Sequence, residues 1–283
     1  MKIDNWIILI ILFLAVFDVF IWGQIVFSAP NKNTEVYFLD VGQGDSELAV
    51  LPGNVKILID AGPNRKVLDE LTSALSPFDR YIDLVVLSHP QLDHFAGLID
   101  VLKRYQVGAF VFNGRRGETA AFGDLEKIIQ ENKIPVIVLG EKDKIKYQDS
   151  RFDVLSPSKN LLSSAELNDT TLVMRLLSQN AKILFTGDID SKIENYLAEK
   201  YELDVDVLKI AHHGSKFSSS EEFLRAATPK LTIIEVGKNS YGHPTEQVLN
   251  RLALIGAQIF RTDKDGTIKL VLDNGRINIF EEK

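Results

Sequence analysis

The chain has 283 residues, of which 45% are hydrophobic and 25% charged, proportions that are ordinary for a protein with a soluble globular core. Its formal net charge of −7 argues against a bulk surface that holds nucleic acid by charge alone, so a phosphate-bearing substrate needs local basic groups or a metal. Because there is no cysteine, a disulfide scaffold, a zinc ribbon and a thiol nucleophile are excluded, and a metal site must use His, Asp, Glu, Asn or Gln.

The first expected element is an almost wholly apolar segment, residues 6–27, interrupted by a single acidic residue, Asp18. It is long enough to cross a bilayer and lacks the polar face of a helix on a soluble core. We therefore predict a transmembrane anchor over residues 1–28, and Lys2 with the starting amine favours an amino terminus on the inner side. The remainder of the chain would then lie outside a bacterial-type cell membrane as part of a single-pass protein. A cleavable signal peptide, which would give a secreted protein, is the alternative.

After a short polar linker at 29–34, the sequence predicts one domain over residues 35–283, in which runs of strands are separated and followed by helices. Strands are expected at 35–40, 47–51, 56–60, 83–87, 109–112, 136–139, 172–177, 182–186, 205–210 and 231–236, and helices at 95–105, 124–132, 192–200, 221–227 and 245–255. Alternation from Ile268 to Ile279 around Asp-Asn-Gly at 273–275 predicts a closing hairpin. This order suits two sheets packed face to face with helices outside.

Four of the five histidines lie in two groups, and the first is Ser88-His-Pro-Gln-Leu-Asp-His94. It stands where an apolar strand ends and a helix begins, a junction that can direct His89, Asp93 and His94 at one point. Imidazole nitrogens together with carboxylate oxygens suit a borderline divalent cation such as zinc or manganese. The alternative interpretation is that Asp93 simply caps the helix.

The second group, Ala211-His-His-Gly-Ser215, also follows an apolar strand. Adjacent histidines point in different directions, so we expect at most one of His212 and His213 to be a direct ligand; two surface histidines are the alternative. Between the groups, a strand ending in Gly187-Asp188 delivers a carboxylate to the same sheet edge, although a turn aspartate is the ordinary interpretation of Gly-Asp alone. Three strands thus end in potential ligands, as a catalytic site on a rigid sheet requires, and Asp188 is able to bridge two ions.

Motifs spread over nearly all of the chain from Glu35 onward resemble, in order, those of the metallo-β-lactamase superfamily and, within it, of the carboxy-terminal domain of the ComEC competence family. They are Phe38-Leu-Asp-Val-Gly-Gln-Gly-Asp-Ser46, Ile57–Gly62, Ser88–Gly97, Asn168–Val173, Phe185–Asp188, Leu208–Ser220, Tyr241–Pro244 and Arg261–Gly266. The resemblance implies an α+β fold, the four-layer αβ/βα metallo-β-lactamase sandwich, and a hydrolase that acts through a metal-activated water. Because only one apolar segment is present in these 283 residues, import of DNA is not implied.

The resemblance also implies a set of metal ligands and one or two divalent ions. The implied ligands are His89, Gln91, Asp93, His94, Asp169, Asp188 and His213. Gln91 falls where the family has a histidine or an aspartate, and a neutral amide oxygen is a weaker ligand. Asp169 stands near a position that is histidine in many members. One site is therefore expected to be complete and the other weakened, and His213 is preferred to His212 because the ligand in relatives directly precedes a glycine.

Further residues receive roles in catalysis, substrate binding or the shape of the site. The expected catalytic residues are Asp93, His212 and His243; the expected substrate contacts are Ser215, Lys216 and His243; the residues expected to shape the site are Asp40, Gln43, Asp45 and Asp60. His243 would bind phosphate or donate a proton to the leaving group, with a plain loop histidine as the alternative. A solvated loop is the alternative for Ser215 and Lys216.

The favoured function is a membrane-anchored, metal-dependent phosphodiesterase or nuclease whose partner is a phosphodiester such as DNA. The alternative, motivated by Gln91, is a metal-poor, non-catalytic relative that binds a ligand or nucleic acid. Hydrolysis of β-lactams is suggested by the superfamily name but not by the ComEC-like pattern. Nothing in the sequence indicates an oligomeric state.

Overall fold

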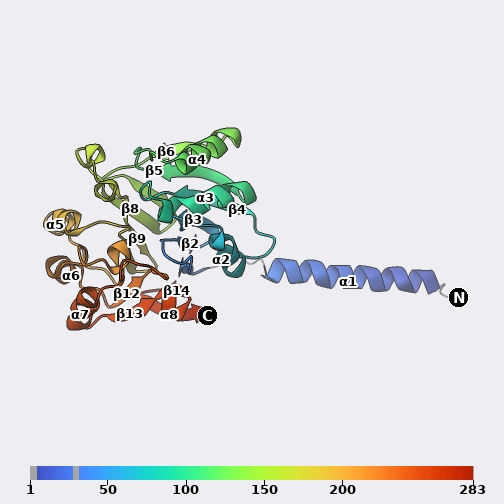
Figure 1. Ribbon diagram of the computed structural model, residues 1–283. Coiled ribbons are helices and arrows are strands. Elements are labelled where there is room, and N and C mark those ends of the chain that lie inside the picture. The colour runs from blue at the N-terminus through green and yellow to red at the C-terminus, as the bar shows by residue number, and fades with distance from the viewer. Residues whose placement is uncertain (1–4, 28–31, 283) are drawn as a thin grey trace.

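The computed structural model describes residues 5–27 and 32–282, and Figure 1 shows them as one long helix joined to a layered domain. The helix α1 (Asn5–Phe27) carries a stretch, Asn5–Gly23, with a mean hydropathy of 2.6, none of which is buried. By length and composition it is able to cross a membrane. The end of the predicted anchor and most of the predicted linker, residues 28–31, lie outside the described residues.

The first sheet has eight strands and contains both ends of the domain. Its strands are β1 (Thr34–Phe38), β2 (Glu47–Leu51), β3 (Val55–Ile59), β4 (Tyr81–Val86), β5 (Gln106–Phe112), β6 (Val136–Val138), β14 (Thr267–Asp273) and β15 (Arg276–Glu282). Their order is β15-β14-β1-β2-β3-β4-β5-β6, with antiparallel pairing from β15 to β3 and parallel pairing from β3 to β6. The predicted hairpin joins β14 to β15, and Asn274 and Gly275 both have positive φ, as a tight two-residue turn requires.

The second sheet has seven strands and is built from the middle and later part of the chain. Its strands are β7 (Lys144–Tyr147), β8 (Ser150–Ser156), β9 (Val173–Ser178), β10 (Ala181–Phe185), β11 (Val207–Lys209), β12 (Leu231–Ile234) and β13 (Gln258–Arg261). They are ordered β13-β12-β11-β10-β9-β8-β7, and β10 to β13 run parallel. Parallel strands end at the same edge, so the loops that follow β10 and β11 leave the sheet side by side.

Helices cover the outer face of each sheet, which makes four layers. One hydrophobic cluster joins the first sheet to α2 (Lys66–Ala74), α3 (Leu92–Arg104) and α4 (Ala120–Glu131), and another joins the second sheet to α5 (Ser191–Lys200), α6 (Glu221–Ala227) and α7 (Glu246–Leu254). A short helix, α8 (Thr262–Asp265), and three single 3₁₀ turns, Leu161–Ser163, Leu167–Thr170 and Ala211–Gly214, lie in connections. The predicted α+β four-layer sandwich is confirmed.

The two sheets hold each other through a continuous apolar layer between them. Phe185 of the second sheet stacks on Phe38 of the first and on Phe152 beside it, with ring centroids 6.0 and 6.1 Å apart. All three rings are buried, and burial of one such side chain contributes about 1.5–3 kcal/mol. This layer fixes the distance between the strand ends that carry the candidate ligands.

Several elements were not predicted, or were predicted with other bounds. Helix α2, the strands β7, β8 and β13, and α8 were missed, and β11 is shorter than the strand expected at 205–210. The alternative interpretation of Asp93 as the helix cap was wrong: α3 begins at Leu92 with Gln91 as its N-cap residue, and Asp93 lies in the first turn. Since that turn is part of the helix, the side chains of Asp93 and His94 are held by regular backbone rather than by a loop.

Candidate metal centre

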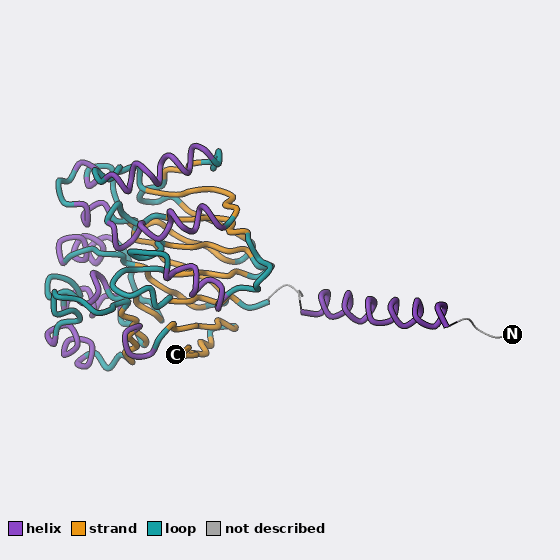
Figure 2. Tube along the Cα trace, turned by 45° about the vertical axis from the view of Figure 1, so that its right-hand side comes forward, coloured by secondary structure: helices purple, strands orange, loops and turns teal. Residues whose placement is uncertain are grey.

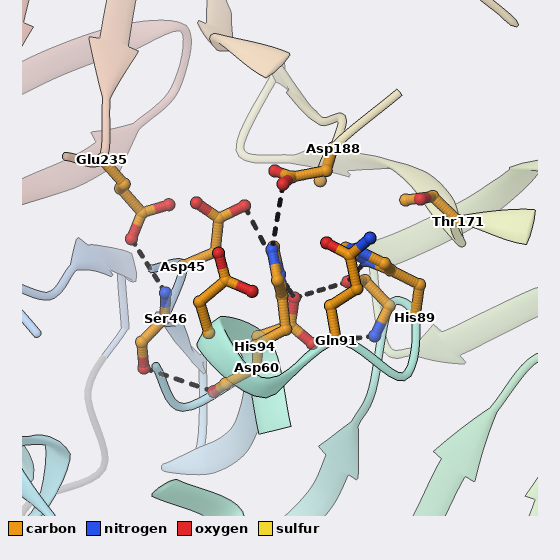
Figure 3. Close-up of polar contacts among 12 residues, drawn as sticks. Asp45, Ser46, Asp60, His89, Gln91, His94, Thr171, Asp188 and Glu235 are labelled. Carbon is orange, nitrogen blue, oxygen red and sulfur yellow. Dashed lines mark hydrogen bonds and ion pairs between the residues drawn. The ribbon is translucent and has the colours of Figure 1, made fainter. Parts of the chain in front are cut away.

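Four side chains from three junctions converge at the carboxyl ends of the central strands. Asp93 and His94 come from the first turn of α3, Asp188 follows β10, and His213 follows β11. One ligand atom from each lies within 4.8 Å of the others. His94 Nε2 is 3.4 Å from Asp188 Oδ2, and His213 Nε2 is 3.7 Å from the same oxygen and 3.5 Å from Asp93 Oδ2 (Figure 3 shows His94 and Asp188). We call these four residues the carboxylate half of the site.

Four potential ligand atoms, of three of these residues and of the neighbouring His89, are buried without hydrogen-bond partners. They are Nε2 of His89, His94 and His213 and Oδ1 of Asp188. Buried polar atoms are nearly always paired in folded proteins, so four unpaired atoms in one place require a partner of another kind. Imidazole nitrogens and carboxylate oxygens at this spacing fit a divalent metal ion. The residues present therefore have the donor atoms that a divalent metal site requires.

The opposite nitrogen of each imidazole is held by the fold. His94 Nδ1 lies 2.7 Å from Asp60 Oδ2, and Asp60 also accepts from Ser88 N at 2.8 Å and Ser88 Oγ at 2.5 Å. His213 Nδ1 donates to the backbone oxygen of Glu235 at 2.7 Å. Such contacts fix the ring and its tautomer, so that Nε2 is presented to the metal point. Asp60 thus contacts both the ring of His94 and the backbone of Ser88; its role in shaping the site stays a prediction.

A strained turn brings both adjacent histidines to the site. His212 and His213 have φ of 51° and 53°, a left-handed conformation that is uncommon for residues with a side chain. Gly214 follows with φ of 81°, and a Cβ there would stand 2.6 Å from Pro244 Cβ. His212 Nε2 lies 3.8 Å from Asp188 Oδ2, almost as near as His213 Nε2. Only His213 belongs to the mutually close group of four, so the preference for His213 over His212 agrees with the geometry.

The second set of implied ligands, His89 and Gln91, has no carboxylate of its own, and we call it the amide half. His89 is fully buried, and its ring centroid is 4.1 Å from that of His94. Gln91 Nε2 donates to Asn168 Oδ1 at 2.7 Å, which leaves the carbonyl oxygen of Gln91 as its available ligand atom. In Figure 3 Gln91 and His89 lie side by side, next to the carboxylate half. Asn168 was not singled out as a contact of Gln91 from the sequence.

Protonation differs between the two halves. Burial by itself would lower the pKa of His213, but the charges of Asp188 and Asp45 outweigh it and raise that pKa to about 10. The pKa of His94 is raised well above its usual value for the same reason, with Asp188 and Asp60 as the nearest charges. Burial and the charge of His94 instead lower the pKa of His89 to about 3. Without metal, the carboxylate half holds protons that a divalent ion would displace, whereas His89 is already neutral.

A group of buried charges lies beneath the carboxylate half and was not predicted as a group. Lys209 is fully buried, pairs with Asp45 and also donates to Gly187 O at 3.2 Å. Glu47 and Glu235 are buried beside Asp45, and Glu235 Oε1 accepts from the backbone N of residue 46 at 3.0 Å. Burial, followed by the charge of Asp45, raises the pKa of Glu235 to about 8. The signal in the sequence was the presence of Glu47, Lys209 and Glu235 in three otherwise largely apolar predicted strands.

The structure does not bring Asp169 into either half. Its carboxylate is buried, forms an ion pair with Lys192 and accepts from Ser164 Oγ at 2.6 Å. Among the described residues it belongs to none of the groups whose ligand atoms lie close together. Asp40 likewise pairs with Lys66 at 2.7 Å, and Gln43 Oε1 accepts from Gly237 N at 3.2 Å, so these two residues hold the loops around the site.

The remaining predicted residues line the rim. The His243 ring is 5.8 Å from the His212 ring, its backbone N and O are both bound by Asn239, and its Nδ1 is buried without a partner. Ser215 is buried, and its Oγ accepts from the backbone N of Phe217 at 3.4 Å, a structural contact. Lys216 is exposed, and its ammonium group lies 5.0 Å from the centre of the Phe217 ring.

Two facing sheets with a His/Asp cluster at the strand ends define a class of metal-dependent hydrolase-like proteins. The family described as the metallo-beta-lactamase superfamily matches residues 39–237, and the chain belongs to it. Its members are generally metal-dependent hydrolases, and their fold binds divalent metals.

Within that superfamily the chain is similar to competence proteins. It is 30% identical to ComE operon protein 3 of Bacillus subtilis (strain 168) over 277 residues, covering 90% of this chain and 35% of the relative. It is also 30% identical to Competence protein ComA of Neisseria gonorrhoeae over 254 residues, covering 88% of this chain and 34% of the relative. The chain thus spans about a third of the length of the curated relatives it matches.

Solved structures with this fold are distant in sequence. The metallo-beta-lactamase fold protein YhfI from Bacillus subtilis has a TM-score of 0.56 at 13% identity, covering 83% of this chain and 99% of that one. A diphosphatase from the PhnP family has a TM-score of 0.51 at 14% identity, covering 85% and 99%. These likenesses show the fold alone.

Proposed function

We propose that this protein is a metal-dependent phosphodiesterase or nuclease, displayed by α1 on the outer side of a bacterial-type membrane. The observation that carries the proposal is the set of buried, unpaired ligand atoms of His89, His94, His213 and Asp188. The names of the competence-protein relatives favour a phosphodiester of nucleic acid, such as DNA, as the substrate. In this proposal residues 1–28 are the anchor, 29–34 the linker and 35–283 the catalytic domain.

The carboxylate half is the proposed main metal site, and the amide half is the proposed weaker one. Asp188 is proposed to serve both. Its Oδ2 lies 3.4 and 3.7 Å from Nε2 of His94 and His213 in the carboxylate half. Burial and the charge of His94 lower the pKa of His89 in the amide half, and the charge of Asp188 opposes them. When bound, a divalent ion lowers the pKa of water and neutralises charge that develops on phosphoryl oxygens. A donor set of nitrogen and oxygen without sulfur suits zinc or manganese.

The rim residues are proposed to handle the substrate. His243 has a lowered pKa, first because of burial and then because of the charges of His212 and His213, so it is neutral near pH 7. A neutral imidazole with an unpaired Nδ1 is suited to donate a hydrogen bond to a phosphoryl oxygen. To pass a proton to the leaving oxygen, it must first take up a proton and become an imidazolium. Lys216 supplies a positive charge for phosphate in a protein whose net charge is negative.

Hydrolysis by the full chain in detergent tests the proposal. Metal-replete protein is assayed on a phosphodiester reporter and on single-stranded DNA, beside Asp188→Asn prepared identically. Loss of turnover in the variant supports the proposal. Equal rates would mean that the hydrolysis comes from a contaminant or from elsewhere on the chain.

A non-catalytic binding relative is the second candidate, and the neutral Gln91 favours it. It predicts that the unmodified protein binds single-stranded DNA without turnover at saturating zinc or manganese. The same assay therefore separates the two functions.

A further inference from the structure

The strands give the catalytic domain two distinct ends. The candidate metal centre lies at the carboxyl ends of β4, β10 and β11, and we call this the site end. We call the opposite end the base; it comprises the β2–β3 turn at 52–54, the α2–β4 loop at 75–80, the start of β5 at 105–106 and the β9–β10 turn at 179–180. Figure 2 shows the strands running from the side where α1 is joined towards the opposite side.

The chain enters the domain at the base. Thr34 Oγ1, at the first residue of β1, is 2.6 Å from Ser178 Oγ, and Gln179 Nε2 donates to the backbone oxygen of Lys32 at 3.3 Å. Only residues 28–33 separate α1 from β1, and a fully extended segment of that length reaches about 25 Å. The 23 residues of α1 measure about 35 Å, slightly more than the apolar thickness of a bilayer. A membrane crossed by α1 is therefore always close to the base.

The base carries an aromatic loop on the side that α1 joins. Phe78, in the loop between α2 and β4, is 87% exposed, and Tyr81 at the start of β4 is 44% exposed. In Figure 1 this loop projects from the domain on the same side as α1. One exposed aromatic residue is ordinary, but a pair at the end nearest a membrane has the amphipathic character of residues that sit at lipid headgroups.

Basic side chains flank the aromatic loop. Lys103 and Arg104, the last two residues of α3, are exposed. They adjoin the loop because the backbone N of Gln106 donates to the backbone oxygen of Arg80 at 2.8 Å, and the Arg80 guanidinium stacks 5.6 Å from the Tyr105 ring centre. In a chain of net charge −7, such a local group of cations favours an anionic surface at this end.

We infer that the base docks on the outer surface of the membrane that α1 crosses, with Phe78 and Tyr81 among the lipid headgroups and Lys103 and Arg104 against anionic lipid. The inference rests on retention of α1 as an anchor but not on hydrolysis by the site. Docking fixes the orientation of the domain relative to the membrane, which the tether alone does not. The six residues of β4 span about 20 Å, so the metal centre is held above the lipid and opens away from it.

The absence of cysteine from the natural chain allows a direct test with single fluorescent labels. Ser76→Cys places an environment-sensitive label in the aromatic loop. Ala165→Cys, the matched control, places it at an exposed position of the site end, in the connection between β8 and β9. The full chain is reconstituted into vesicles of phosphatidylcholine with phosphatidylglycerol. Quenching by a nitroxide lipid and by aqueous iodide is then measured for each label.

We expect the Ser76 label to be quenched several-fold more by the nitroxide lipid than the Ala165 label, and several-fold less by iodide. Adding Phe78→Ser to the Ser76→Cys chain should abolish this difference, whereas Phe280→Ser, which removes another exposed ring, 51% accessible, from β15, should not. Lys103→Glu combined with Arg104→Glu should reduce the protection of the Ser76 label from iodide. Vesicles of pure phosphatidylcholine should reduce the same protection in the chain that keeps Lys103 and Arg104.

Equal quenching of the two labels by both agents would overturn the inference. So would protection of the Ser76 label in detergent micelles that rises with protein concentration, because that result indicates contact between copies of the chain. If the chain were recovered in the soluble fraction without α1, α1 would be a cleaved signal and the inference would also fail. None of these outcomes bears on the proposed hydrolysis, which is assayed separately in detergent.

Discussion

The carboxylate half and the amide half of the candidate metal centre adjoin through His94 and His89, whose ring centroids are 4.1 Å apart, yet they are built differently. The carboxylate half combines two imidazoles with Asp93 and Asp188, and each of its imidazoles is held from behind by Asp60 or by the backbone of Glu235. The amide half offers one imidazole and one neutral amide that is held by Asn168.

From this difference we expect two metal sites of unequal affinity, because proximity of the donor atoms alone is not sufficient for binding. A divalent ion taken from water needs negative ligands as well as a suitable geometry. The carboxylate half supplies that charge. Beneath it the buried Lys209 pairs with Asp45, so protons are not the only positive charges that balance the buried carboxylates. The amide half would depend on sharing Asp188.

Asp188→Asn should have the largest effect, because it removes the one carboxylate proposed to serve both halves. Phosphodiester hydrolysis should fall by orders of magnitude and metal content should drop, while the folded core survives because the side chain keeps its volume. Activity, metal analysis and circular dichroism measure the three quantities. Asp169→Asn is the control and should retain metal, since its carboxylate pairs with Lys192 instead. Comparable metal loss in both variants would contradict the assignment of Asp188.

His243→Ala should have the next largest effect and leave both halves loaded. If the His243 imidazole contacts the substrate, turnover should decrease about 10²-fold with metal content unchanged. His213→Ala is the contrasting variant, which should lose metal. A His243→Ala protein that loses metal to the same extent would show that His243 belongs to the metal centre rather than to the rim.

The pH dependence of metal binding should distinguish the halves. Protons on His94 and His213 must leave before an ion binds, so affinity for the carboxylate half should increase with pH by up to about two log units per unit. Since burial keeps His89 neutral, with a pKa of about 3, the amide half should show little dependence near neutrality. Because folding raises the pKa of His213, its proton stabilises the metal-free fold fully at pH values below 6.5, the usual pKa of histidine. This stabilisation is lost as the pH rises through about 10. Titrations of metal at several pH values, with thermal unfolding of the metal-free protein, measure both trends.

Gln91→His should have the smallest effect and should make the metal affinities of the two halves more similar. We expect about one tightly bound ion in the unmodified protein at limiting metal, and an additional, partly occupied site after an imidazole replaces the amide. Gln91→Ala is the control and should gain nothing. Two equally tight ions in the unmodified protein would show that the amide oxygen is as good a ligand as a charged one.

The sequence predicted the ligand-bearing junctions well, because each follows an apolar strand that stops at a polar group. His89, Asp188 and His213 were expected at strand ends, and all three lie there. Their roles as ligands stay predictions. Strand β7 was missed because it has only four residues, although Ile145 and Tyr147 alternate with two lysines and pack against the core. Strand β8 was missed because Arg151 and Asp153 interrupt its apolar residues.

The buried charges could not be predicted, because a charged residue in an apolar strand does not reveal its partner. Lys209 and Asp45 are 164 residues apart, and their ion pair exists only once the two sheets face each other. The same limit explains the difference between the expectation and the structure at Asp169. From the sequence, a loop carboxylate near a motif can contact either a metal or a lysine. The packing of α5 places Lys192 against Asp169, so its carboxylate pairs with that lysine.

The pairing of β1 with β14 sets the order in which the domain can be completed. Thr34 lies opposite Leu272, so β1 finds this neighbour only after the residues up to β14 have been made. Until then one edge of β1 is an open hydrogen-bonding template. Closure of the first sheet is thus a late, long-range step, and its timing depends on β14 rather than on the residues that carry the candidate metal centre.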